Sequence, residues 1–140
     1  MELSVKKNKS SSFIFAPLIL FILIFATFVK IYALNISPLE LSVDEAQYWH
    51  WSKKLDFGYF SKPPLIAWLI SISTSIFGNE EWSVRIFSTI VHFFISIILW
   101  ITSNELFDRK SGAYAALIWM FLPLTSFGSF IISTDTPLLF

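Results

Sequence analysis

The chain has 140 residues, of which 55% are hydrophobic and 14% are charged, and it contains no cysteine. A soluble domain of this size carries about 25% charged residues, so the composition argues against a soluble protein and indicates a polytopic membrane protein. The formal net charge is zero, which gives no support to a nucleic-acid partner. Without cysteine there is no disulfide framework and no thiolate metal site. We therefore predict one all-α domain built from transmembrane helices.

The N-terminal part predicts a cytoplasmic tail followed by a first span. Residues 1–12 are polar and carry three lysines, which favours the cytoplasmic side. The apolar run over 13–34 has about the 20 residues that cross the hydrocarbon core. Lys30 lies near the end of this run and is expected to snorkel to the interface. A cleaved signal peptide is the alternative, but the run is long for one and no A-x-A site follows it.

Residues 35–85 are expected to form an outer loop. Within it, Ser42 and Glu45 have the spacing of a capping box, which predicts an interfacial helix over about 43–57. Asp44 and Glu45 then lie in the first turn, where the helix dipole stabilises ionised carboxylates. Tyrosine and tryptophan side chains on the same helix favour a position along the membrane surface.

The next apolar segment decides the topology. Residues 64–77 would reach about 21 Å as a helix, short of the ~30 Å hydrocarbon core, so we predict an interfacial or re-entrant helix that does not cross. All five candidate site residues then share the outer side of the membrane. They are Asp44, Glu45, Lys62, Arg85 and Asp135.

The rest of the chain predicts further spans. A second span is expected over 86–102, and a short charged turn then leads to a third span over 112–132, with Pro123 tolerated inside it as a kink. A fourth span is expected to begin at residue 137, which makes 13–140 an incomplete transmembrane domain.

The candidate residues have alternative interpretations. Asp44 could act as a general base or only cap its helix, and Asp135 on the same face could share the first role. Lys62 precedes two prolines and is held extended, so it could bind a phosphate or pair with anionic lipid. Arg85 could hold a phosphate or anchor the outer end of its span.

His92 lies in the middle of the second span. We expect it to make a hydrogen bond between helices rather than bind a metal, because no second histidine stands at ligand spacing. The chain also lacks the glycine-rich, CxxC and HExxH motifs of nucleotide and metal enzymes. We therefore predict no metal and no certain cofactor.

At this point the sequence shows a resemblance. The stretch DEAQYWHWSKKLDFGYFSKPPLIAWL resembles the first outer loop of the GT-C glycosyltransferases. It is most similar to the bacterial family 39/83 enzymes, which include protein mannosyltransferases, the lipid A aminoarabinose transferase and the RgtA/B/C/D-like domain. Four features match in order: the acidic pair, the aromatic helix, the GYFxKPP turn and the FG…E…VR segment. The segment STDTPL is similar to the acidic turn before the fourth span of that family.

The resemblance implies a multi-pass enzyme of the bacterial inner membrane. Such an enzyme moves a sugar from a polyprenyl-phosphate donor to a lipid, glycan or protein acceptor on the periplasmic face, usually by direct displacement with inversion. It implies Asp44 as the catalytic base, Glu45 as its support and Asp135 as a second acidic site residue. It also implies that Lys62 and Arg85 hold the donor phosphate.

Two other classes of protein remain as alternatives. A transporter component would carry polar residues inside its spans, and here these are His92 and scattered serines, without an acidic residue or arginine. A non-enzymatic membrane anchor or accessory subunit is also compatible with a chain of this length. Substitution of Asp44 separates both from a transferase.

Overall fold

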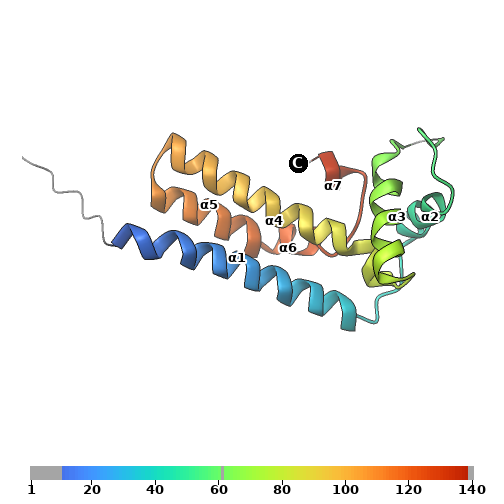
Figure 1. Ribbon diagram of the computed structural model, residues 1–140, viewed down its shortest axis with the longest axis horizontal. Coiled ribbons are helices and arrows are strands. Elements are labelled where there is room, and N and C mark those ends of the chain that lie inside the picture. The colour runs from blue at the N-terminus through green and yellow to red at the C-terminus, as the bar shows by residue number, and fades with distance from the viewer. Residues whose placement is uncertain (1–10, 61, 139–140) are drawn as a thin grey trace, which may run out of the picture.

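The computed structural model describes residues 11–60 and 62–138, and within them the chain is helical with no β-strand (Figure 1). This confirms the prediction of an all-α protein. Most of the expected cytoplasmic tail lies outside the described residues, as do the last two positions of the expected fourth span. The helices are α1 (Ser11–Ile36), α2 (Val43–Ser52), α3 (Leu65–Phe77), α4 (Glu81–Leu106), α5 (Arg109–Phe121), α6 (Pro123–Gly128) and α7 (Asp135–Leu138).

Helices α1, α4 and α5 lie side by side and form the long bundle of the molecule (Figure 1). In the described part of the chain, α1 and α4 have the length and apolar composition to cross a membrane, over 16–36 and 81–106. The exposed face of α1 is also apolar, with Phe21, Phe25 and Phe28 exposed, and an exposed apolar face fits a lipid environment. The bundle core contains Ile19, Leu23, Ala26, Ala113, Ala116 and Met120.

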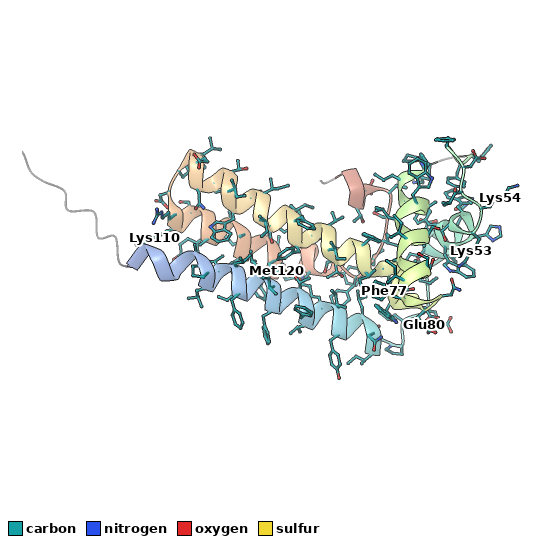
Figure 2. All side chains as sticks on the ribbon, in the orientation of Figure 1. Lys53, Lys54, Phe77, Glu80, Lys110 and Met120 are labelled. Atoms are coloured by element: carbon teal, nitrogen blue, oxygen red, sulfur yellow. The ribbon has the colours of Figure 1, made fainter. Side chains whose placement is uncertain are left out.

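The charged side chains that Figure 2 labels lie at the two ends of this bundle. Lys110 is at one end, and Lys53, Lys54 and Glu80 are at the other, while Met120 lies between them. This placement avoids the free-energy cost of placing a charged side chain in the hydrocarbon core of a membrane.

The turn between α4 and α5 brings these two helices into close contact. Asp108 caps α5 by accepting the backbone N–H of Ser111 at 2.7 Å, and this hydrogen bond lowers the pKa of the Asp108 carboxyl. Gly112 follows in the first turn of α5, where an added Cβ would lie 2.8 Å from the backbone oxygen of Trp100. The absence of a side chain at Gly112 therefore allows the two backbones to approach each other.

The third predicted span is not one helix. α5 ends at Phe121, Leu122 is extended with φ −59° and ψ 129°, and Pro123 begins α6. The expectation of a mere kink inside a continuous helix over 112–132 is therefore wrong. Proline lacks an N–H and favours an extended residue before it, so the chain breaks at this point and resumes as a short helix.

Lys30 helps to stabilise this break. Its Nζ donates a hydrogen bond of 2.9 Å to the carbonyl oxygen of Met120, which Ser126 Oγ also contacts at 2.9 Å. Thr125 Oγ1 donates to the carbonyl oxygen of Trp119. Broken helices persist at membrane depth when such groups satisfy the freed carbonyls. The expectation that Lys30 snorkels to the interface is thus wrong, since its ammonium turns into the bundle.

Helices α2 and α3 lie across one end of the bundle, beside the start of α4 (Figure 1). Their apolar side chains form a second buried cluster with α4 and with the segment that follows α6. Its members are Tyr48, Ile66, Ile70, Val84 and Ile132. Tyr48 is therefore a core residue of this end and not only an interfacial aromatic side chain.

Helix α2 is shorter than the predicted range of 43–57. It ends at Ser52, and the chain then folds back so that the ring of Tyr59 stacks on Trp51 with centroids 4.8 Å apart. The Tyr59 hydroxyl lies 3.1 Å from the carbonyl oxygens of both Trp51 and Lys54. The single O–H of Tyr59 can donate to either carbonyl, and it anchors the returning chain at the point where α2 has ended.

Candidate active site

The carboxylate of Glu45 joins three separate parts of the chain at the end of the bundle beside α2 and α3. It accepts hydrogen bonds from the backbone N–H of Ser42 at 2.9 Å and of Ile132 at 3.1 Å. It also accepts two from Arg85, through Nε at 2.9 Å and Nη2 at 2.7 Å. Glu45 is 1% exposed and Arg85 is 5% exposed. The pair therefore ties α2 to α4 and to the segment after α6.

Arg85 has little hydrogen-bonding capacity left for a ligand. Besides its two bonds to Glu45, Nη1 donates to the carbonyl oxygen of Leu39 at 2.9 Å and Nη2 to that of Glu40 at 2.8 Å. A guanidinium has five N–H donors, and these contacts use four of them. The side chain holds the entry to α2 in place from within the core.

The protonation of Glu45 reflects competing effects. Burial alone would raise the pKa of its carboxyl. The hydrogen bonds from Arg85, Ser42 and Ile132 and the charge of Arg85 together outweigh burial and hold the pKa below its ordinary value. Glu45 is thus an ionised carboxylate at neutral pH, as its partner Arg85 requires.

The two acidic residues in the first turn of α2, Asp44 and Glu45, have different surroundings. The predicted capping box is confirmed, because the Ser42 side chain accepts the Glu45 N–H while the Glu45 side chain accepts the Ser42 N–H. Asp44 follows Ser42 in the same turn but is exposed. One carboxylate is therefore buried and paired, and its neighbour is exposed to solvent at the positive end of the helix dipole.

The side chain of Lys62 contacts the segment that contains Thr134 and Asp135. An isolated bridge between Tyr59 and Lys62 shapes the turn before the two prolines. The Lys62 side chain is exposed, and its Nζ lies 3.3 Å from Thr134 Oγ1. Asp135, also exposed, follows Thr134 as the first residue of α7. The chain thus brings an exposed ammonium close to the segment that carries Asp135.

Buried hydroxyl groups of α4 hold this second segment. Ser88 Oγ lies 2.7 Å from the carbonyl oxygen of Ile131 and 3.1 Å from that of Gly128. Thr89 Oγ1 donates to the carbonyl oxygen of Ser129 at 2.8 Å. Because the backbone is not helical between α6 and α7, these donors replace the missing helix bonds inside the protein.

A hollow of about 460 Å³ lies between α4, the α5–α6 break and α7. Asp135 contributes to its rim, and His92 and Trp119 contribute stacked rings with centroids 5.6 Å apart. We expected His92 to make a hydrogen bond between helices. Its Nδ1 does not make one, because this atom has no partner among the described residues. The full lining is His92, Trp119, Leu122, Leu124, Thr125, Gly128, Ser133, Asp135 and Thr136.

The five predicted site residues all lie at this end of the molecule, but in two different settings. Glu45 and Arg85 are buried and bonded to each other, whereas Asp44, Lys62 and Asp135 are exposed. Sequence reasoning missed Thr134, which contacts Lys62, and the backbone N–H of Ile132, which contacts Glu45. A backbone donor carries no signature in the sequence. No cluster of three metal-ligating side chains occurs in the described residues.

Comparison with known proteins assigns the chain to a protein family. A sequence model described as dolichyl-phosphate-mannose-protein mannosyltransferase matches residues 61–140, more than half of its length. The chain belongs to this family. The resemblance to GT-C glycosyltransferases that the outer loop indicated is thereby confirmed. No solved structure matches the chain.

A curated relative of this GT-C chain agrees with that placement. Over 115 residues, which are 81% of the chain, the sequence is 35% identical to the lipid A galacturonosyltransferase RgtD of Rhizobium johnstonii. The match covers 24% of the relative, so the chain spans about a quarter of its length. The family model begins at residue 61, and the relative's longer match therefore also supports the N-terminal part of the GT-C chain.

Proposed function

We propose that this chain serves a membrane glycosyltransferase that moves a sugar from a polyprenyl-phosphate donor to an acceptor on the periplasmic face of the bacterial inner membrane. The N-terminus would be cytoplasmic, so that the end with α2, α3 and α7 faces outward. The observation that carries the proposal is that Asp44, Lys62 and Asp135 are exposed at one end of a bundle that belongs to a glycosyltransferase family.

In this proposal Asp44 is the catalytic base. Its carboxylate would take the proton from the acceptor hydroxyl as that oxygen attacks the anomeric carbon of the donor sugar. The bond from that carbon to the phosphate oxygen breaks, and the polyprenyl phosphate leaves with the electron pair. Lys62 would stabilise the negative charge on this leaving group, and Asp135 would orient the acceptor or share the role of base.

Glu45 and Arg85 receive a different role from the three exposed residues. We propose that Glu45 supports Asp44 by fixing the first turn of α2. Arg85, which sequence reasoning paired with the donor phosphate, is bonded to Glu45 and to the chain before α2. It would act as a positioning residue, leaving the phosphate to Lys62.

The acceptor is proposed to be a lipid. The name of the relative that is 35% identical specifies lipid A, whereas the description of the family specifies protein. Both acceptors present a hydroxyl to the base, so the chemistry at Asp44 is the same for each. A lipid acceptor, like the donor, reaches exposed groups at the headgroup layer by diffusion in the membrane.

Substitution of Asp44 tests the function. Asp44→Asn removes the base at nearly constant shape and should lower sugar transfer by about 10²-fold or more. Asp56→Asn is the matched control, because Asp56 is an exposed acid of the same outer loop without a role in the proposal. Transfer would be measured in inverted and right-side-out vesicles with lipid-linked sugar and lipid A.

The alternatives predict other results in the same vesicles. An anchor or accessory subunit should tolerate Asp44→Asn with no change in any transfer supported by the membrane. A transporter component should change the flux of solute and not the transfer of sugar. Full transfer by a folded Asp44→Asn protein would overturn the proposal.

A further inference from the structure

Lys30 carries a positive charge inside the apolar bundle, within the part of α1 that has the length and composition of a membrane span (16–36). An ionisable side chain in such a segment is costly, and where one occurs it is paired and usually has a function. The Nζ of Lys30 donates to the carbonyl oxygen of Met120 at 2.9 Å, and Met120 lies between the charged ends of the bundle (Figure 2). The reaction proposed above uses no atom of Lys30, so this charge needs an explanation of its own.

The acceptor of this hydrogen bond belongs to the end of α5. Met120 lies in the last turn of α5, which ends at Phe121 and has no basic residue of its own in that turn. The carbonyl end of a helix is the negative end of its dipole, and a cation there is stabilising. Lys30 supplies that cation from a different helix. The bond therefore links α1 to the point at which the third apolar segment breaks.

The helix that follows the break is held by polar contacts rather than by buried side chains. None of the residues of α6 is buried. Ser126 Oγ donates to the same carbonyl oxygen as Lys30, at 2.9 Å. At the end of α6, hydroxyl groups of α4 bond to the carbonyl oxygens of Gly128 and Ser129, at 3.1 and 2.8 Å. Because packing contributes little, the position of α6 depends on these hydrogen bonds.

Helix α6 forms part of the wall of the hollow that Asp135 borders. Leu124 and Thr125 line it from α6, and Asp135 and Thr136 line it from α7. The segment 129–134 joins the two helices. A displacement of α6 therefore reaches Asp135 through the shared wall and through the chain.

We propose that Lys30 is a positioning residue, whose ammonium holds the α5–α6 break from within α1 and thereby sets the place of Asp135. The inference rests on the proposed function for the role of Asp135, and it deepens that function by naming a residue that acts on the site from another helix. Lys30 acts through Met120 and α6 and does not itself contact the reacting groups.

Distances between spin labels measure the position of residue 135 without any transfer reaction. The chain contains no cysteine, so Asp135→Cys and Ile101→Cys, the latter at an exposed position of α4, can each take a nitroxide label. A second pair, Ile101→Cys with Ile72→Cys at an exposed position of α3, reports the frame that α3 and α4 form. Double electron–electron resonance in lipid nanodiscs gives a distribution of distances for each pair.

The variant Lys30→Met removes the ammonium and keeps most of the apolar stem. We expect it to shift or broaden the distribution between positions 101 and 135 and to leave that between positions 101 and 72 unchanged. Lys30→Arg keeps a cationic N–H donor and should restore the first distribution. In chains that retain Asp135, Lys30→Met should lower sugar transfer by up to about 10²-fold, because small misplacements of a site residue have effects of this size, and Lys30→Arg should recover it.

Thr27→Val is the matched control. Thr27 lies about one turn before Lys30 on the same helix, and its hydroxyl donates within α1 to the carbonyl oxygen of Leu23 at 2.8 Å. The substitution removes a polar group of α1 that makes no bond to α5. Both distance distributions and the rate of transfer should therefore stay as in the wild type.

Several results would overturn the proposal. They are an unchanged distribution between positions 101 and 135 in Lys30→Met, an equal change in Thr27→Val, no recovery in Lys30→Arg, a change in both label pairs, and full transfer by Lys30→Met. Loss of transfer in Asp44→Asn with an unchanged distribution in Lys30→Met would retain the proposed function and reject this role of Lys30 alone. Full transfer by Asp44→Asn with a changed distribution in Lys30→Met would reject the proposed function and support the link from Lys30 to residue 135.

Discussion

The substitution Glu45→Gln tests whether the buried pair with Arg85 organises the end of the bundle beside α2 and α3. Glutamine keeps the size of the side chain but replaces an anionic acceptor by an amide that must present two N–H groups of its own. In the structure, four donors converge on the Glu45 carboxylate. The NH₂ group of the amide would therefore lie opposite at least one of these N–H donors, where no hydrogen bond can form. The Arg85 charge would also remain buried without its counter-charge.

The expected magnitude follows from the burial of both partners. Glu45 is 1% exposed and Arg85 is 5% exposed, so solvent cannot compensate for the lost charge. Removing one member of a buried ion pair costs about 3–5 kcal/mol. Glu80→Gln is the matched control. Glu80 is exposed and its side chain makes no cap hydrogen bond, so its substitution should change the free energy of unfolding by less than about 0.5 kcal/mol.

The assay is SDS-induced unfolding in mixed micelles, followed by far-UV circular dichroism at several pH values. The folded pKa of Glu45 lies below the ordinary value of 4.5, so its stabilising effect is complete above that value and is lost as the pH falls through the folded pKa. The stability difference between wild type and Glu45→Gln should be constant near neutral pH and should shrink below about pH 4.5.

A double substitution completes the test. Replacing Glu45 and Arg85 together by methionine removes both charges, and it should cost less than the sum of the two single replacements. The reasoning would be refuted if Glu45→Gln resembled Glu80→Gln in stability, or if the double substitution were additive. Either result would mean that the pair is not coupled in the folded protein.

Three further changes probe the packing around the site. Gly112→Ala places a methyl group against the α4 backbone and should cost about 1–3 kcal/mol in the same unfolding assay, whereas Gly58→Ala has open space and should be neutral. Ser42→Ala removes the capping box and should cost about 0.5–2 kcal/mol, visible also as faster hydrogen exchange in the first turn of α2. Thr89→Val leaves the Ser129 carbonyl without its donor and should cost about 1–3 kcal/mol; an unchanged unfolding midpoint would show that water replaces the hydroxyl.

The sequence predicted those parts of the fold that depend on local chemistry. Ser42 and Glu45 are three residues apart, and that spacing alone is enough to place the start of α2. Length alone indicated that the segment before Gly78 is too short to cross, and the structure places it across the end of α4 as the 13-residue helix α3. The membrane character followed from composition, because hydrocarbon demands apolar side chains whatever their order.

The features that the sequence did not reveal depend on partners distant in the chain. Lys30 near the end of an apolar run suggested snorkelling, but its ammonium contacts a carbonyl 90 residues away at Met120. Arg85 could have faced a phosphate, yet its partner Glu45 lies 40 residues before it. Pro123 suggested only a kink, but the chain breaks there, and the hydroxyls of Thr125 and Ser126 bond to the freed carbonyls.

The bond between Glu45 and the Ile132 backbone has a consequence for biogenesis. The two residues are 87 positions apart, and at about 5–20 residues per second a ribosome needs roughly 4–17 s to make the intervening chain. During this interval Glu45 lacks its last donor. The end of the molecule that contains α2 and α3 can therefore reach its final shape only after the ribosome has made Ile132, late in the synthesis of these 140 residues.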